Sequence, residues 1–286
     1  MNTEKIHPNH TTTAAGVDYY DGPDLVAGLI DALHEAGLDE HKLDIDDLAA
    51  LDEFHAQGRA ATVALAALAS LQPGERVLDV GSGIGGPARF LAARLGVVVT
   101  ALDATERFCQ VAEMLTRGTG LQDRVTVVRG DALSLPFDDE SFDGVWTQAL
   151  SQNIFDKRRF ISELARVLRP GGRAAMFELV SGPGGPVVYP VPWADTSDQS
   201  SIVSADELHG LLEAEGLTVG PINRGQAVLE SILAAAAQLT PSPAQQSLGL
   251  ELLMPDFEAR MAGLARNVVQ RRIELWQAIA TRPLRS

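Results

Sequence analysis

The sequence predicts an α/β fold in which a mainly parallel sheet is covered by helices on both faces. Residues 76–80 form a short apolar run that leads directly into a glycine-dense loop at 81–86. From residue 76 to about residue 180, apolar runs alternate with helical patterns, as a parallel sheet with covering helices requires. Asp103 follows a second apolar run, 20 residues beyond Gly83. Strand, glycine loop, helix, strand and acidic residue together indicate a nucleoside-binding β-α-β unit.

Length, charge and cysteine content exclude several classes of protein. The 286 residues suffice for one large α/β domain with an elaboration. A formal net charge of −15 repels a phosphate backbone, so we expect no nucleic-acid partner. The single cysteine, Cys109, excludes an internal disulfide and a cysteine-rich zinc site, and we expect no metal.

The chain is expected to be cytoplasmic. Residues 1–16 are polar and show no signal peptide. The longest apolar stretch, residues 232–237, is far too short to cross a bilayer, so no membrane partner is expected.

Two helical segments are predicted before the first strand. Residues 1–17 are expected to form a mobile tail, and residues 18–72 a helical cap segment. Apolar residues at helical spacing predict one helix over 24–37 and a second over 48–71. Gln72, Pro73 and Gly74 end the second helix just before the sheet begins.

The segments after the fifth apolar run alternate loop, helix and strand. Residues 182–186 are rich in glycine and proline and predict a loop. Residues 204–207 have the pattern of a capping box that begins a helix ending near Gly216. Residues 217–222 fit a strand, and residues from 226 to about 270 show a mainly helical pattern.

The glycine pattern alone is a weak signal. Gly81, Gly83 and Gly86 satisfy G-x-G-x-x-G, which also occurs in tight strand-to-helix turns that bind nothing. Asp103 favours a ligand, because a carboxylate at that position accepts both hydroxyl protons of a ribose. An ordinary turn residue at the strand end is the alternative role of Asp103.

Over about residues 50–222, the chain resembles the class I S-adenosylmethionine-dependent methyltransferases. Four segments carry the resemblance, in the usual order and spacing: VLDVGSGIGG at 77–86, Leu-Asp-Ala at 102–104, Gly-Asp-Ala at 130–132 with Leu-Pro-Phe at 135–137 and Ser-Phe-Asp at 141–143, and RVLRPGG at 166–172.

The resemblance implies a Rossmann-like sheet of seven strands with the last strand antiparallel. Residues 217–222 would then be the sixth strand and residues 273–280 the seventh. The implied organisation is a cofactor-binding core at 73–225, a helical insertion or lid at 226–270, and a last strand with the C-terminus at 271–286.

The resemblance also implies the cofactor, S-adenosyl-L-methionine, with S-adenosyl-L-homocysteine as its product. The glycine loop would hold the methionine part, Asp103 the ribose, and Asp131 the adenine amino group. The residues assigned to the cofactor are Asp79, Gly81, Ser82, Gly83, Asp103, Ala104, Asp131, Ala132 and Gln148.

Two other functions compete with methyl transfer. A nicotinamide-dependent oxidoreductase also uses the glycine pattern and Asp103. Asp79 within the first strand and the Gly-Asp-Ala segment at 130–132 argue against it. The second competitor is a protein that binds S-adenosylmethionine but has lost catalysis.

Tyr20 and His55 are the candidate catalytic residues. Enzymes similar to this one often fold an N-terminal segment over the cofactor, although Tyr20 could equally serve in packing. On a continuous helix, His55, Arg59 and Thr62 share one face, with Gly58 inside that helix at a cost of about 1 kcal/mol. A buried structural histidine is the competing role of His55.

The acceptor is expected to be a small molecule, an amine or an aromatic or indole-type secondary metabolite. Gln148, Gln152 and Asn153 follow the fourth strand, where ligands bind in such sheets. The absence of histidine from 148 to 153 argues against base-assisted O-methylation from this position and leaves an amine or an electron-rich carbon more open, with N, C or O as the acceptor atom. We expect a monomer or homodimer. The residues assigned to the acceptor are Tyr19, Phe54, Asn153, Trp193 and His209.

Overall fold

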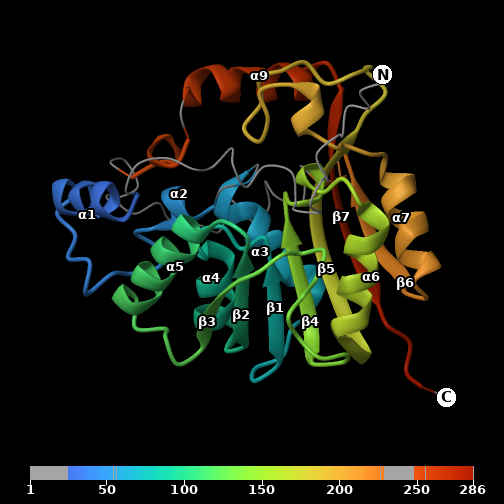
Figure 1. The fold of residues 1–286 in the computed structure, drawn as a ribbon, viewed down its shortest axis with the longest axis horizontal. Helices are drawn as coiled ribbons and strands as arrows, with labels where there is room; N and C mark the ends of the chain where they lie inside the picture. The colour runs from blue at the N-terminus through green and yellow to red at the C-terminus, as the bar shows by residue number, and fades with distance from the viewer. Residues whose placement is uncertain are drawn as a thin grey trace, which may run out of the picture.

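A seven-stranded sheet forms the centre of the molecule (Figure 1). The computed structural model describes residues 25–53, 55, 57–225, 227–228, 248–254 and 256–285. The strand order is β3-β2-β1-β4-β5-β7-β6, and β7 is antiparallel to both of its neighbours, which confirms the predicted sheet. The strands are β1 (Arg76–Val80), β2 (Val98–Asp103), β3 (Val125–Arg129), β4 (Phe142–Gln148), β5 (Leu168–Ser181), β6 (Thr218–Arg224) and β7 (Ile273–Thr281).

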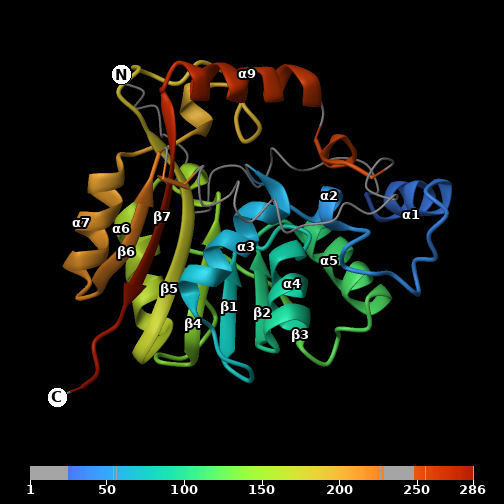
Figure 2. The same ribbon diagram turned by 180° about the vertical axis from the view of Figure 1, so that it is seen from behind.

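Helices cover both faces of the sheet, because alternate residues of each strand point to opposite sides. Val77 packs with α3 (Gly58–Ala69) and α4 (Gly86–Leu95), which lie in front of the sheet in Figure 2. Leu78 packs on the other face, with α6 (Lys157–Val167) and α7 (Ala205–Ala214). The remaining described helices are α1 (Leu25–Glu35), α2 (Ala49–Asp52), α5 (Glu106–Gly118), α9 (Phe257–Val269) and the 3-10 turns η2 (Ser151–Asn153), η3 (Ser197–Gln199) and η5 (Leu250–Leu252).

The segment before β1 differs from the prediction in one place. The continuous helix expected over 48–71 is wrong, since α2 ends at Asp52 and α3 begins only at Gly58. Gln57 and Gly58 have φ values of 72° and 54°, in the left-handed region that interrupts a right-handed helix. Gly58 therefore begins α3 rather than lying inside a helix, and His55 belongs to the connection between the two helices.

The capping box and the later elements match their predictions. Ser204 Oγ accepts a hydrogen bond from the backbone N–H of Glu207 (3.1 Å) at the start of α7. The expected helical insertion at 226–270 is described in η5 and α9, while residues 229–247 lie outside the described part of the chain. Of the helices in the described ranges, none is long and apolar enough to cross a membrane.

The N-terminal helices are attached to the start of α4 by a buried ion pair. Arg89 Nη2 lies 2.5 Å from Asp52 Oδ1, and both side chains are fully buried. Arg89 also donates to the carbonyl of Ile84 (2.8 Å), which fixes the turn after the glycine loop. A Cβ atom at Gly86 would lie 2.1 Å from the carbonyl oxygen of Asp52. The third glycine of the motif therefore lets α2 approach α4 closely.

Replacement of Gly86 by alanine should destabilise the protein by about 2 kcal/mol or more, because the added methyl collides with rigid backbone. Gly210→Ala on α7 is the matched control, since nothing lies within 4 Å of its Cβ position. It should stabilise by about 0.5–1 kcal/mol through helix propensity. Urea unfolding measures both changes, and a neutral Gly86→Ala variant would contradict the close approach.

Candidate functional site

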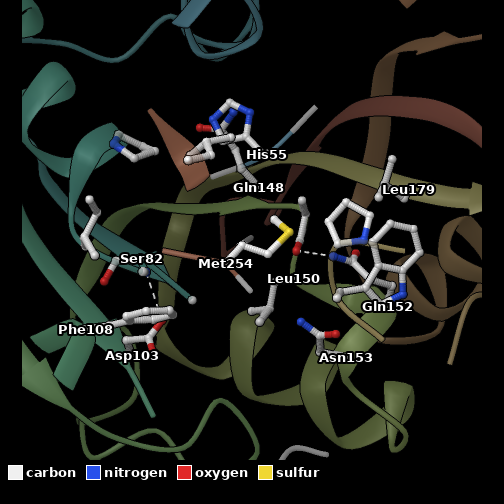
Figure 3. Close-up of a pocket in the computed structure, with 18 of the residues that line it drawn as sticks. His55, Ser82, Asp103, Phe108, Gln148, Leu150, Gln152, Asn153, Leu179 and Met254 are labelled. Atoms are coloured by element: carbon white, nitrogen blue, oxygen red, sulfur yellow. Dashed lines mark hydrogen bonds between the residues drawn. The ribbon is translucent and has the colours of Figure 1, made fainter. Parts of the chain in front are cut away.

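A cavity of about 480 Å³ lies at the carboxyl ends of the parallel strands (Figure 3). Its wall includes residues that follow β1, β2, β3 and β4, and it continues past β5 to β7 and α9. This is the edge of an open α/β sheet at which ligands bind. The sequence motifs that predicted a nucleoside site thus meet at one place.

The glycine loop after β1 is held in shape by the end of β2. The backbone N–H groups of Gly81 and Ser82 both donate to the carbonyl of Leu102, at 2.8 and 3.0 Å. Gly81 and Gly83 have φ values of 73° and 54°, which favour glycine. A Cβ atom at Gly83 would meet nothing within 4 Å, so the loop leaves open space beside its second glycine.

Asp103 closes the other side of this space. Its Oδ2 accepts from the N–H of Gly83 (2.9 Å) and its Oδ1 from the N–H of Thr105 (2.8 Å). Burial raises the pKa of Asp103, although these two amides oppose the rise. A carboxylate has about four lone-pair sites, so Asp103 keeps capacity to accept from two hydroxyl groups of a ligand.

Asp79 lies beneath the loop as a second buried carboxyl group. It is 2% exposed, and its Oδ2 has no hydrogen-bond partner among the described residues. Burial, followed by the charges of Asp103 and Glu53, raises the pKa of Asp79 to about 8. A positive charge in the cavity would relieve this crowding of carboxylates.

Further polar groups of the cavity wall have no partner within the described ranges. An unpaired buried polar atom costs about 1–3 kcal/mol, so several of them around one cavity indicate a polar ligand. Figure 3 shows Ser82 on one side of the cavity and Gln152 and Asn153 on the other. The unpaired atoms are Ser82 Oγ, Gln148 Nε2, Gln152 Oε1 and Asn153 Oδ1.

The loop after β4 is positioned by Glu178 of β5, which is fully buried. Its Oε1 accepts from Thr147 Oγ1 (2.7 Å), and its Oε2 accepts from the N–H groups of Leu150 (3.1 Å) and Ser151 (2.9 Å). Ala149 has a φ of 52°, a conformation that non-glycine residues rarely adopt. Glu178 therefore holds a tightly turned loop whose residues form the rim of the cavity.

His55 and Glu53 form a hydrogen-bonded pair at the cavity wall. His55 Nε2 lies 2.7 Å from Glu53 Oε2, and Glu53 also bonds Arg59 and Thr62 Oγ1 (2.7 Å). Burial opposes ionisation of Glu53, but these three partners together lower its pKa to about 2. The edge contact between the rings of His55 and Phe177, with centroids 5.9 Å apart, adds a constraint on the imidazole.

Gln148 connects this pair to the sheet. Trp146 Nε1 donates to Gln148 Oε1 (2.7 Å), and Thr62 Oγ1 lies 3.2 Å from the same oxygen. These contacts orient the amide so that its Nε2 is the atom left without a partner. His55 Nε2 lies 3.2 Å from Thr62 Oγ1, and both groups also bond the carboxylate of Glu53. They do not share a helix face, because His55 precedes the helix α3 that contains Thr62.

Most of the residues assigned from the sequence line this cavity. Tyr19, Tyr20 and Phe54 lie outside the described residues, so their roles stay predictions. The assigned residues found in the wall are His55, Asp79, Gly81, Ser82, Gly83, Asp103, Ala104, Ala132, Gln148, Asn153 and Trp193.

Asp131 and His209 are not among the lining residues. Asp131 Oδ1 accepts from the N–H of Leu133 (2.8 Å) and shapes the turn whose neighbours, Gly130 and Ala132, do line the cavity. His209 is on α7, with its Nε2 3.2 Å from Glu213 Oε1. The structure thus places His209 away from the acceptor, since α7 packs against α6 and β6.

Sequence reasoning missed Glu53 and Glu178, and it expected a helical lid at 226–270 without identifying the residues of α9 that line the cavity. Glu178 had a readable signal, because a lone acidic residue in the apolar run 174–180 requires buried partners. Glu53 had none, since it is one of several acidic residues in its segment. Met261, Leu264 and Ala265 of α9 come close to β5 only through the tertiary fold.

Comparisons with known proteins agree with this geometry. Residues 78–176 match the family model described as "Methyltransferase domain". Methyltransferase GfsG of Streptomyces halstedii is 37% identical over 134 residues, 47% of this chain and 48% of that protein. The 27-O-demethylrifamycin SV methyltransferase of Amycolatopsis mediterranei (strain S699) is 37% identical over 166 residues, 57% of this chain and 60% of that protein. The chain thus spans about half to three fifths of these relatives.

The solved structure of the [4+2]-cyclase SpnF has a similar fold. It superposes with a TM-score of 0.60 at 24% identity, covering 78% of this chain and 81% of that one. The sheet order and the glycine loop agree with the methyltransferase domain matched at residues 78–176. In this part the chain is similar to S-adenosylmethionine-dependent methyltransferases of class I.

Replacement of Asp79 by asparagine should remove a pH-dependent destabilisation. Asp79 keeps its proton in the folded protein up to about pH 8, whereas in the unfolded chain it ionises near pH 4. Unfolding therefore releases a proton from Asp79 between pH 4 and pH 8, so the contribution of Asp79 to the stability of the wild type falls as the pH rises over this range. We expect Asp79→Asn to gain on the order of 1–3 kcal/mol relative to wild type between pH 5 and pH 8.

Urea unfolding of the cofactor-free protein at pH 5 and at pH 8 measures this gain in stability. Asp123→Asn, which changes an exposed carboxyl group, is the control and should follow wild type. A stability difference between Asp79→Asn and wild type that stays constant with pH would contradict the assignment.

Proposed function

We propose that the protein transfers the methyl group of S-adenosylmethionine to a small molecule. The observation that carries this proposal is the convergence of the glycine loop, Asp103 and several unpaired polar groups on one cavity. The sulfonium of this cofactor supplies an activated methyl group, so the chain need only align the acceptor and exclude water. S-adenosylhomocysteine would be the product.

The residues present suit this cofactor. Asp103 would accept the ribose hydroxyls, the loop from Gly81 to Gly83 would hold the methionine part, and the turn at 130–132 would border the adenine. Asp79 lies beside the same loop with an unpaired oxygen. Its carboxyl group would offset the positive charges of the sulfonium and the ammonium group.

The charge of the cavity wall also disfavours a nicotinamide dinucleotide. Over the described ranges, the wall contains Asp52, Asp79 and Asp103 but neither lysine nor arginine. A dinucleotide carries a negatively charged pyrophosphate, for which the described wall offers no cationic side chain and which Asp103 would repel. The cationic sulfur cofactor carries the charge opposite to that of the acidic wall.

His55 is the proposed base for an acceptor hydroxyl, with Glu53 as its positioning residue. Glu53 is ionised at neutral pH and lies 2.7 Å from His55 Nε2, so it can orient the imidazole. Proton transfer to His55 would be stabilised by this adjacent carboxylate. The pair belongs to the connection between α2 and α3 and not to the loop after β4, where the sequence lacks a histidine.

Some predictions are not tested by the fold and stay proposals. They are the catalytic role of Tyr20, an acceptor of the amine, aromatic or indole type, a cytoplasmic location, independence from metals, and a monomeric or homodimeric state.

Asp103→Ala should weaken binding of S-adenosylmethionine by about 1–3 kcal/mol, because two ribose hydroxyls lose their acceptor. Isothermal calorimetry measures the affinity, and Asp206→Ala on the exposed surface of α7 serves as control. Wild type should be stabilised against heat by S-adenosylmethionine and not by NAD. Unchanged affinity in Asp103→Ala would exclude the ribose contact, and a response to NAD alone would exclude the proposed function.

His55→Gln should lower turnover by about 100-fold, the usual contribution of a general base. The affinity for S-adenosylhomocysteine should stay near that of wild type. His209→Gln, outside the cavity, is the matched control and should retain full turnover. Release of S-adenosylhomocysteine with a panel of hydroxylated acceptors measures the rates.

The loss in His55→Gln should shrink as the pH approaches the pKa of the acceptor hydroxyl, because an ionised oxygen needs no base. Equal rates for His55→Gln and His209→Gln would remove His55 from the mechanism.

A further inference from the structure

The cavity changes character along the edge of the sheet. Its polar groups belong to the part over β1 to β4, described above. In the described ranges, every lining residue from position 179 onward is apolar. We call this part the β5–β7 half. Leu179 of β5 and Leu275 of β7 are register partners in adjacent strands and form its floor.

Helix α9 supplies the wall opposite this floor. It runs across the end of the sheet at which the parallel strands terminate (Figures 1 and 2). Met261, Leu264, Ala265 and Val268 line the cavity, and their spacing of i, i+3, i+4 and i+7 places them on one face of the helix. One apolar helix stripe is therefore turned toward the cavity.

The neighbouring face of α9 is fixed to the loop after β5. Asn267 accepts from the N–H of Val188 (2.9 Å) and donates to the carbonyl of the same residue (2.7 Å). A Cβ atom at Gly263 would lie 1.9 Å from the carbonyl oxygen of Pro190, so only glycine permits this approach. These contacts set the rotation of the helix about its axis.

The buried cation of α9 belongs to the same fixed face. Arg260 is 4% exposed and pairs with Asp195 (2.7 Å) and with the carbonyl of Val191 (3.2 Å). Because it is held there, Arg260 does not line the cavity. Among the described residues, the β5–β7 half thus offers no charged side chain that could pair with a positively or negatively charged ligand.

We propose that the β5–β7 half is the acceptor site and that it selects molecules whose buried part is apolar and uncharged. This inference rests on the proposed function for the position of the methyl donor over β1 to β4. A phosphate, carboxylate or ammonium group placed against this wall would lose its hydration without gaining a partner. An apolar framework would instead gain by burying its surface.

Three matched fluorescent probes test the charge preference: 1-pyrenebutanol, 1-pyrenebutyrate and 1-pyrenebutylamine, which are neutral, anionic and cationic at pH 7. Each is titrated against the full chain saturated with S-adenosylhomocysteine, and pyrene emission reports binding. The neutral probe should bind at least fivefold more tightly than either charged probe. A smaller preference, or tighter binding of a charged probe, would overturn the proposal.

A matched pair of variants locates the probe. Ala265→Lys places a cation at the cavity wall, whereas Ala262→Lys places it on the same helix at an exposed residue outside the cavity. The first should weaken binding of the neutral probe at least fivefold, and the second should leave it as in wild type. Equal effects, or none in Ala265→Lys, would exclude the β5–β7 half as the binding site.

Calorimetry with S-adenosylhomocysteine separates this inference from the proposed function. Both lysine variants should bind this product as wild type does, because neither changed residue belongs to the part of the cavity over β1 to β4. If wild type fails to bind it, the proposed function is wrong whatever the probes do. If it binds while the charged probes match the neutral one, only the acceptor inference fails.

Discussion

The buried pair of Asp52 and Arg89 is the contact on which the architecture of the site depends. It fixes the N-terminal helices against the start of α4, and Gly86 makes that approach sterically possible. A buried ion pair adds little net stability, but the loss of one partner leaves an uncompensated charge. The position of Glu53, and therefore of His55, follows from this contact because both come directly after α2.

The core of the site could be predicted from the sequence because its residues lie within single motifs. The glycines at 81–86, Asp79 and Asp103 follow consecutive strands, so the topology of a parallel sheet brings them together without further information. The roles of Glu53 and of the cavity-lining residues of α9 could not be predicted. Their positions depend on tertiary contacts between residues far apart in sequence, such as that of Asn267 with Val188. The helix expected over 48–71 was wrong because its periodicity could not show the left-handed residues at Gln57 and Gly58.

Fold and chemistry are specified by different parts of this molecule. The neighbouring structure SpnF is described as a [4+2]-cyclase, while the sequence relatives are described as methyltransferases. A shared sheet therefore does not decide the reaction, which resides in the site. The proposed cofactor site lies at the ends of β1 to β4. The proposed acceptor site lies between β5, β7 and α9.

The crowding of Asp79 and Asp103 bears on the release of a cationic ligand. Asp79 is buried and Asp103 half-buried, and the described cavity wall holds neither lysine nor arginine. In the proposed methyl transfer the sulfonium becomes a neutral thioether, so the attraction between the ligand and these carboxyl groups would weaken when the product forms. Departure of the spent cofactor would then be favoured by electrostatics.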